Sequence, residues 1–319
     1  MQFSIREGRG CAVLTLRWYQ RGVLKPAVMI VLVFLLCPVL QSNARVLIDQ
    51  MGREVNLPDD PQRVVSLAPN VTETVFALGQ EHRLKGVTLF SNFPPQAKAI
   101  PRVGSYVQLD LERIVALRPD LCIATKDGNP KETIDRLVSL NIPVYAVDPR
   151  DLDSIMETIL EIGDILDARK EATALVNRMH SRIQNINVRV EHSTTRPSVF
   201  YQIGISPIIS AGTHTFINEL IVLAGGRNLA HGPVPYPQFS REQVLALSPE
   251  VFIISSMSRK AIFEQVKREW SKWSGLPAVR NQKIFLVDSD ILDRPTPRLV
   301  EGLERLTRLI HPELFEETK

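Results

Sequence analysis

The sequence predicts an α/β protein of two Rossmann-like lobes with mostly parallel sheets, joined by one long α-helix. Three observations predict this class. A helix–turn–strand unit occurs twice, at residues 109–124 and 239–254. Short apolar runs typical of buried strands alternate with helical segments in each half of the chain. Between the two copies, apolar residues recur every three or four positions along residues 172–190, as expected of a long amphipathic helix.

The two copies share their start and stop signals. Asp110 and Ser240 stand where an N-cap side chain accepts a hydrogen bond from a free backbone N–H group. Ser240 and Gln243 also have the spacing of a capping box. Pro119 and Pro249 end the helices, because proline cannot continue the hydrogen-bond ladder. A duplicated unit at this spacing indicates two similar lobes.

Length and composition indicate an ordinary globular protein. The 319 residues are enough for two compact domains, and 44% of them are hydrophobic and 23% charged. The formal net charge of +3 comes from residues 1–44, which hold five basic residues and one acidic residue. The remainder holds 33 basic and 34 acidic residues, so a nucleic-acid-binding surface is not expected.

Residues 1–44 are predicted to be an export signal peptide that is cleaved near Ala44. A basic segment leads into the apolar run 27–40, and small residues precede the cleavage position. A membrane anchor is the alternative, but a span needs roughly 20 apolar residues, and this run has 14. Lipoprotein anchoring is not expected, because the residues around Cys37 fit such a signal poorly.

Cleavage would remove two of the three cysteines. Cys122 would remain, inside an apolar run that suits a buried strand. A lone buried cysteine is more often a core residue than a nucleophile. The exported chain is therefore expected to have no intramolecular disulfide and to rely on its core for stability.

Residues 45–166 are predicted to form the N-terminal lobe. Strands and helices alternate along it, which favours a parallel sheet covered on both faces. Outside the first repeat copy, the expected elements are a hairpin at 46–57, strands at 63–67, 84–88 and 143–147, and helices at 72–78, 131–140 and 151–166.

Residues 167–193 are predicted to form the helix that joins the lobes. A helix of roughly 25 residues would be ~37 Å long at 1.5 Å per residue. The alternative is a packing helix within one lobe, but its place between the two repeat copies favours the linker. The stripe consists of Ala172, Leu175, Met179, Ile183, Ile186 and Val190.

Residues 194–319 are predicted to form the C-terminal lobe. Its first helix closes on Gly225 and Gly226, as the helix at 72–78 closes on Gly79. Outside the second repeat copy, the expected elements are strands at 199–203 and 283–287, helices at 213–223, 261–273 and 297–310, and a stiff loop at 233–237.

The chain has none of the motifs of common catalytic sites. No P-loop, no G-x-S-x-G nucleophile elbow and no H-E-x-x-H motif occurs. The six histidines are scattered, without the spacing of metal ligands. A metal-handling lyase or chelatase on a similar two-lobed sheet would need clustered Cys or His ligands. We therefore expect a binding protein without a bound metal rather than an enzyme.

The candidate ligand-binding residues lie in loops at the expected carboxyl ends of the strands, where open α/β sheets bind ligands. Aromatic and apolar side chains with a few polar groups suit a large, partly flat small molecule in a cleft shared by the lobes. The alternative is that these side chains pack the loops against their own lobe. The candidates are Phe90, Asn92, Phe93, Tyr106 and Thr125 in the first lobe and Ile203, Tyr236, Ile291, Asp293 and Arg294 in the second.

Four segments, at residues 63–73, 94–97, 111–121 and 235–245, resemble the periplasmic cobalamin-binding proteins of ABC importers. The resemblance extends over nearly all of residues 45–312. That family belongs to the helical-backbone, or class III, periplasmic binding proteins, which also carry ferric siderophores and haem. The resemblance implies two lobes that face each other across a cleft and are joined by one long helix.

The resemblance also implies a function. A monomeric periplasmic protein would capture cobalamin or a related corrinoid in the interlobe cleft and deliver it to an ABC permease dimer with its ATPase subunits, without a covalently bound cofactor. A ferric-siderophore or haem receptor is the alternative, and an anionic siderophore would favour several basic side chains in the cleft. Where cobalamin binders often have tryptophan, this chain has Tyr106, Thr125, Tyr236 and Ile291.

Glu112 and Glu242 occupy equivalent positions in the two repeat copies. The resemblance implies that they meet arginines of the permease, one from each lobe. A carboxylate in the first turn of a helix is also stabilised by the helix dipole, by ~0.3–1 kcal/mol. A purely local role at the helix start is therefore the alternative.

Overall fold

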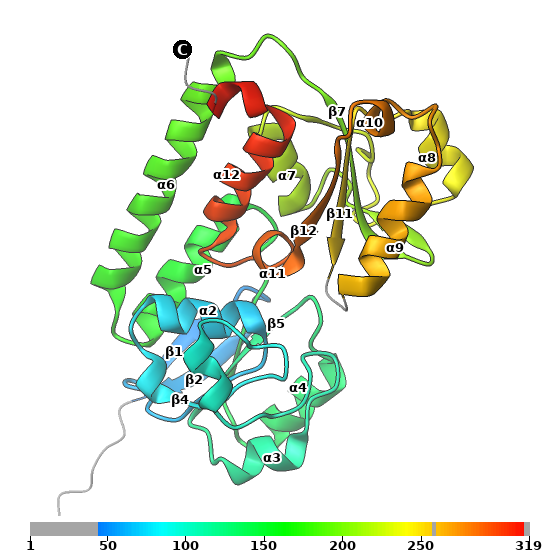
Figure 1. Cartoon of the computed structure of the whole chain (residues 1–319). Helices are drawn as coiled ribbons and strands as arrows, with labels where there is room; N and C mark the ends of the chain where they lie inside the picture. Colours follow the sequence, from blue (N-terminus) through cyan, green and yellow to red (C-terminus); the bar gives the residue numbers. More distant parts are fainter. Residues whose placement is uncertain (1–43, 257–259, 316–319) are drawn as a thin grey trace, which may run out of the picture. The chain divides into compact units, whose positions relative to one another are not determined.

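The computed structural model describes residues 44–256 and 260–315, which form two α/β lobes within the unit Ala44–Lys319 (Figure 1). The predicted signal peptide lies outside the described residues, apart from Ala44. Within the described part of the chain, no helix combines the length and the apolar composition needed to cross a membrane.

The N-terminal lobe is built on a four-stranded parallel sheet of order β4-β3-β5-β6. Helices α2 and α5 cover one face and α3 and α4 the other, because alternate side chains of each strand enter two separate clusters. The elements are β3 (Val64–Ser66), α2 (Pro69–Ala77), η2 (Glu81–Arg83), β4 (Leu84–Gly86), η3 (Pro95–Ala99), α3 (Leu111–Ala116), β5 (Leu121–Thr125), α4 (Lys131–Ser139), β6 (Val144–Val147) and α5 (Leu152–Ile165).

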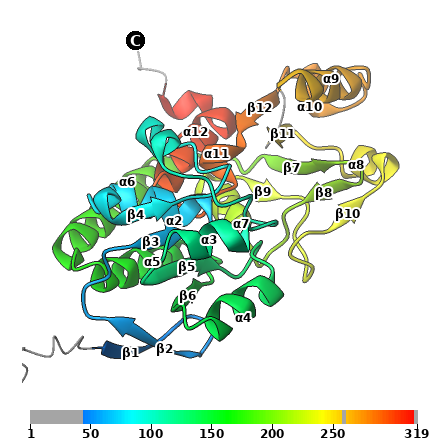
Figure 2. The same ribbon diagram turned by 90° about the horizontal axis from the view of Figure 1, so that it is seen from below.

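The predicted hairpin forms a separate antiparallel pair, β1 (Ala44–Ile48) and β2 (Glu54–Pro58). It lies beside the edge strand β6 (Figure 2), where the Gln50 backbone N–H donates to the Ala146 carbonyl over 3.2 Å. Arg45 Nη2 donates to the Asp164 and Ile165 carbonyls over 2.9 and 2.8 Å, which fastens β1 to the end of α5. The hairpin thus covers an otherwise open sheet edge.

The C-terminal lobe is built on a six-stranded sheet of order β10-β8-β7-β11-β12, with β9 also paired to β7. Strands β9, β7, β11 and β12 are parallel, whereas β8 pairs antiparallel with both of its neighbours, β7 and β10. The elements are β7 (Ser198–Ile205), β8 (Ile208–Ser210), α7 (Phe216–Leu223), β9 (Arg227–Asn228), β10 (Gln238–Phe239), α8 (Arg241–Leu247), β11 (Val251–Ser256), α9 (Lys260–Ser271), α10 (Pro277–Arg280), β12 (Ile284–Asp288), α11 (Ser289–Leu292), α12 (Leu299–Ile310) and η4 (Pro312–Phe315).

Helix α6 (Arg169–Glu191) is 23 residues long and runs beside both lobes (Figure 1). It packs on α5 of the N-terminal lobe and on α12 and α7 of the C-terminal lobe. Its buried stripe is the predicted one, except that Val176 is buried where Leu175 was predicted, and Leu175 is only partly buried. One continuous hydrophobic cluster therefore extends from α2 and α5 through α6 to α7 and α12. The predicted two-lobed α/β class with a long helix is confirmed.

The two repeat copies fold as predicted, into α3–β5 and α8–β11. Asp110 Oδ1 accepts from the Arg113 N–H over 3.1 Å, and Ser240 and Gln243 form a capping box. Both copies also share a left-handed residue before the proline, Arg118 with φ 47° and Ser248 with φ 51°.

An acidic residue after the proline anchors the neighbouring strand in each lobe. The Asp120 carboxylate accepts from the backbone N–H groups of Gln62 and Arg63 over 2.8 and 2.9 Å, just before β3. Glu250 Oε2 accepts from the N–H and hydroxyl groups of Ser198, over 2.7 and 2.8 Å, at the start of β7. These bonds hold the pKa of Glu250 below its usual value. The repeat thus carries a strand anchor as well as a capped helix.

Several element boundaries differ from the prediction. Helix α2 begins at Pro69 instead of Thr72, because proline at the first helical position already has the required φ. Helix α7 begins at Phe216 behind the N-cap Thr215, and α12 begins at Leu299 after the unpredicted single turn α11. Strands β8, β9 and β10 have only two or three residues, too few for a recognisable period.

A substitution at Gly163 tests how closely α5 and α6 must approach each other. A Cβ atom at Gly163 would lie 2.5 Å from the Ala172 Cβ atom of α6. Alanine normally favours a helix over glycine by about 1 kcal/mol, but here the helices would have to separate. We expect Gly163→Ala to lower the free energy of unfolding by ~1–3 kcal/mol, the usual cost of overpacking. Urea unfolding measures this, with the exposed Asn177→Ala in α6 as control. An unchanged or higher stability would contradict the close packing.

Candidate functional site

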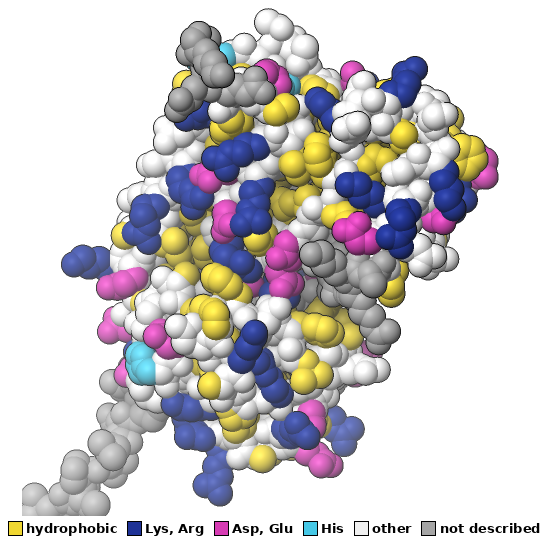
Figure 3. Space-filling model, in the orientation of Figure 1, with side chains coloured by type: hydrophobic (Ala, Val, Ile, Leu, Met, Phe, Trp, Pro, Cys, Tyr) yellow, Lys and Arg dark blue, Asp and Glu magenta, His cyan; other side chains and the backbone are white. Residues whose placement is uncertain are grey.

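A cavity lies between the two lobes and follows the carboxyl ends of β3, β5, β6 and β12. Its enclosed volume is about 200 Å³. Figure 3 shows acidic and basic side chains next to one another where the lobes meet. The lining residues are Ala68, Pro69, Asn70, Phe90, Tyr106, Thr125, Asp127, Asp148 and Pro149 of the N-terminal lobe and Phe216, Tyr236, Ser289, Asp293, Arg294 and Pro295 of the C-terminal lobe.

The structure brings six of the ten predicted ligand-binding residues to this cavity. They are Phe90, Tyr106, Thr125, Tyr236, Asp293 and Arg294. Phe90 on one lobe is 42% exposed and Tyr236 on the other 45% exposed. The enclosed space is smaller than the ~300–1,000 Å³ typical of ligand pockets. A large ligand held here would therefore extend into solvent between these two aromatic side chains.

The structure places the other four predicted residues outside the cavity. Ile291 is buried, and Ile203 packs against the hydrophobic core, because each side chain points to the covered face of its element. Asn92 Oδ1 accepts from Arg294 Nη1 over 2.9 Å, and its Nδ2 donates to Asp290 Oδ2 over 2.6 Å. The Phe93 ring lies against the Arg298 guanidinium at 3.7 Å. Asn92 and Phe93 thus contact the opposite lobe rather than the cavity.

Some of the lining residues were not predicted from the sequence, although some of them also lie at the carboxyl ends of strands, where ligands are expected. Asp127 and Asp148 stand just after β5 and β6, at the same carboxyl edge. Asn70 and Phe216 lie at the starts of α2 and α7, whereas the sequence predicted helices at 72–78 and 213–223 and no ligand-binding residue in either. Charged residues after a buried strand were the signal that could have found the first two.

The Tyr106 ring is held by its own lobe. It makes an edge-on contact with Phe90, with ring centroids 5.9 Å apart. It also lies over Gly128, where a Cβ atom would come within 2.5 Å of the ring. Asn129 Nδ2 donates to the Leu67 and Tyr106 carbonyls, both over 2.8 Å, so one side chain ties this loop to the end of β3. The aromatic wall is therefore preformed.

The cavity wall is more acidic than basic. It contains the carboxylates of Asp127, Asp148 and Asp293 and one guanidinium, that of Arg294. Asp148 also pairs with Lys126 and Arg150, each over 2.9 Å. Carboxylate oxygens accept hydrogen bonds from amide and hydroxyl donors and repel anions. The wall thus favours a ligand with many N–H or O–H donors over an anionic one.

Asp293 is bound to two buried hydroxyl groups. Tyr201 donates to its Oδ1 atom over 2.7 Å and Ser255 to its Oδ2 atom over 2.6 Å. Burial raises the pKa of Asp293 from the ordinary 3.8 to about 6, although both hydrogen bonds lower it. Burial likewise raises the pKa of Tyr201.

The described part of the chain holds no candidate metal site. No group of three or more His, Cys, Asp or Glu residues there could hold a metal ion. Cys122 is a buried free thiol whose pKa is raised by burial, as expected for a core residue.

Glu112 and Glu242 are exposed in the first turns of α3 and α8. Among the described residues, no basic nitrogen lies within 4.0 Å of either carboxylate, so neither forms an ion pair there. The backbone N–H group at the start of α8 and the Ser240 hydroxyl hold the pKa of Glu242 below its usual value. Both side chains are thus on the surface of their lobes.

Comparison with known proteins gives consistent matches. Residues 64–291 match a family model described as periplasmic binding protein. The vitamin B12-binding protein of Photorhabdus laumondii is 31% identical over 252 residues, which cover 79% of this chain and 88% of that protein. The solved structure of the periplasmic vitamin B12 binding protein BtuF of Vibrio cholerae is similar with a TM-score of 0.70 and 30% identity, covering 81% of this chain and 99% of that one. A periplasmic haem-binding protein from Pseudomonas aeruginosa is similar with a TM-score of 0.73 and 29% identity, covering 79% and 93%.

Asp293 makes stability depend on pH. The native carboxyl holds its proton up to a pKa of about 6, whereas the unfolded one releases it near 3.8. The native state therefore binds more protons between these values, and stability falls as pH rises through this window. We expect the parent to lose ~2–3 kcal/mol relative to Asp293→Asn between pH 4 and pH 7, at 1.36 kcal/mol per pKa unit. Urea unfolding across this range measures it, with the exposed Asp59→Asn as control. Parallel pH profiles of parent and variant would contradict this role.

Proposed function

Because the chain belongs to the periplasmic binding protein family, we propose that it is the substrate-binding protein of an ABC importer for cobalamin or a related corrinoid. The ligand would bind in the cavity between the lobes and be delivered, chemically unchanged, to the permease. The relatives described as vitamin B12-binding support this ligand, since they span most of the chain.

The cavity wall is the observation that carries this proposal. Phe90, Tyr106 and Tyr236 offer aromatic surface to a flat ring system. The carboxylates of Asp127, Asp148 and Asp293 offer acceptors for the amide N–H groups that surround a corrin ring. A corrinoid exceeds the enclosed volume, so the exposed rims formed by Phe90 and Tyr236 would grip it from two sides.

A haem or ferric-siderophore receptor is the alternative. The similarity to a haem-binding protein supports it, and the phenol groups of Tyr106 and Tyr236 are possible iron ligands. Haem carries two carboxylates and many siderophores are anionic, however, whereas the described wall has three carboxylates and a single guanidinium. The charge of the wall therefore favours the corrinoid.

Delivery requires partners outside this chain. We infer that the protein acts as a monomer in the periplasm and docks onto a permease dimer with its ATPase subunits. Glu112 and Glu242 would make the contact, one from each lobe. Residues 45–166 and 194–319 would be the two lobes and residues 167–193 the linking helix. The capture of cobalamin as cargo would need no covalent cofactor and no catalytic group.

Titration with cyanocobalamin, haem and a ferric siderophore tests the ligand. We expect a corrinoid absorption change and tight binding for cyanocobalamin alone. Tyr106→Ala and Tyr236→Ala should each weaken it by roughly 0.5–1.5 kcal/mol, the usual share of aromatic stacking. Tyr106→Phe and Tyr236→Phe keep the ring and should retain the affinity. Tight haem binding that the Phe variants abolish would instead establish iron ligation by the phenol.

Substitutions of Glu112 and Glu242 test the delivery of the ligand to the permease. Charge pairs across an interface fix register and accelerate encounter, and an unpaired partner can cost ~2–5 kcal/mol. We expect Glu112→Ala with Glu242→Ala to bind ligand and melt like the parent but to fail in uptake. Charge reversal to arginine should be worse, and exchange of the permease arginines for acidic residues should partly restore transport. Uptake by the double alanine variant at the parental rate would leave both glutamates as helix-start residues only.

A further inference from the structure

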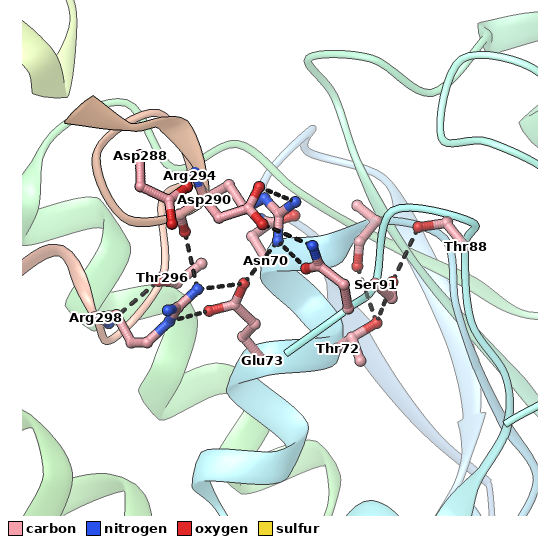
Figure 4. A network of polar contacts seen from close by, with 12 residues as sticks. Asn70, Thr72, Glu73, Thr88, Ser91, Asp288, Asp290, Arg294, Thr296 and Arg298 are labelled. Carbon is pink, nitrogen blue, oxygen red and sulfur yellow. Dashed lines mark hydrogen bonds and ion pairs between the residues drawn. The ribbon is translucent and has the colours of Figure 1, made fainter. Parts of the chain in front are cut away.

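A buried charge network joins the two lobes next to the ligand cavity (Figure 4). Its centre is Glu73 on α2, whose side chain is only 2% exposed. Arg294 Nη1 donates to Glu73 Oε1 over 3.0 Å, and Arg298 Nε donates to Glu73 Oε2 over 2.8 Å. Both carboxylate oxygens of Glu73, in the N-terminal lobe, are therefore bound by guanidinium groups of the C-terminal lobe.

The two arginines are enclosed as well. Their side chains are 14% and 18% exposed. Arg294 also pairs with Asp290 and donates to Asn92, while Arg298 donates to the Asp290 carbonyl over 3.0 Å and lies on the Phe93 ring. Two carboxylates thus balance two guanidinium groups, and loss of one partner would leave a poorly solvated charge.

The position of this network decides what it can do. Glu73 lies on α2, which packs on α5, and Arg298 directly precedes α12, which packs on α6. The network therefore connects two elements that pack on the adjoining helices α5 and α6. Asn70 on the same helix as Glu73, and Arg294 itself, line the cavity.

A second polar contact joins the lobes, and here the carboxylate belongs to the C-terminal lobe. Glu219 of α7 accepts from the Leu152 backbone N–H, at the start of α5, over 2.7 Å. One glutamate of each lobe is thus bound by the other lobe. Two such contacts oppose both separation and twisting about α6.

We infer that Glu73, Arg294 and Arg298 form a permanent interlobe strut, in which Glu73 and Arg298 are positioning residues for ligand binding. The strut sets the spacing of the cavity walls, and Glu73 fixes the direction of the Arg294 side chain at the wall. It stays formed with and without ligand, because Glu73 is buried, the two arginines are largely enclosed, and each charge has a partner within the network. The effect on affinity rests on the proposed corrinoid function; the effect on lobe spacing does not.

Pulsed electron resonance tests the strut without any ligand. Nitroxide labels on Glu132→Cys in α4 and Gln265→Cys in α9, both exposed, report the distance between the lobes. Cys11 and Cys37 are replaced by serine, and the buried Cys122 is protected from labelling. We expect one narrow distance distribution for the parent and at least a doubling of its width for Glu73→Gln, which keeps the shape of the side chain but removes its charge.

Arg298→Gln breaks the same pair from the other lobe and serves if Glu73→Gln does not fold. Since both variants remove one strut, we expect their combination to be no broader than either alone. Glu301→Gln removes an ion pair to Arg305 within α12 and should leave the distribution unchanged. Parental widths in both strut variants, or the same broadening in the Glu301 control, would overturn the strut.

Calorimetric titration with cyanocobalamin tests the positioning role. We expect Glu73→Gln and Arg298→Gln each to weaken binding at least tenfold, and Glu301→Gln to stay within twofold of the parent. A broadened distance with parental affinity would show that the strut does not position the cavity walls and would overturn that part. A parent protein that binds no corrinoid would contradict the proposed function, while the distance measurement would still decide the strut.

Discussion

The arrangement of this protein depends on the packing of one long helix, α6, against helices of both lobes. The apolar stripe of α6 is buried against α5 on one lobe and against α7 and α12 on the other, so a single hydrophobic cluster crosses the whole described unit. Burial of apolar area is non-directional and cannot by itself set an angle between lobes. The close contact at Gly163 and Ala172 supplies part of the missing specificity, because it leaves no room for another spacing.

The cavity follows from the duplicated unit. Each copy places a capped helix before a buried strand, and each uses a carboxylate to anchor the next strand of its sheet. The carboxyl ends of both sheets consequently face the same space, where their loops supply the aromatic and acidic walls. The helix starts that carry Glu112 and Glu242 are exposed on each lobe. The proposed docking residues thus lie within the repeat, and the cavity residues Tyr106 and Tyr236 lie just before its two copies.

The charged side chains at the junction of the lobes have two roles: some join the lobes, and others line the cavity. The arginines near the cavity are largely occupied by Glu73 and Asp290, so little positive charge remains for an anionic ligand. Asp293 is desolvated and bound to two hydroxyl groups, which keeps it as a fixed acceptor. This division makes a neutral, donor-rich ligand the best match for the wall and leaves the arginines to join the lobes.

The sequence by itself determined the two-lobed α/β class, the long helix, the helix caps and the repeat, because these depend on periodicity and turn chemistry within a few residues of each other. It also located six of the residues that line the cavity, from the rule that ligands bind at the carboxyl ends of strands. The sequence could not show that Ile203 and Ile291 turn into the core, or that Asn92 and Phe93 contact the opposite lobe. Only the tertiary structure decided that Glu73 meets arginines 221 and 225 residues away, because that pairing exists only once two separately folded lobes are held face to face.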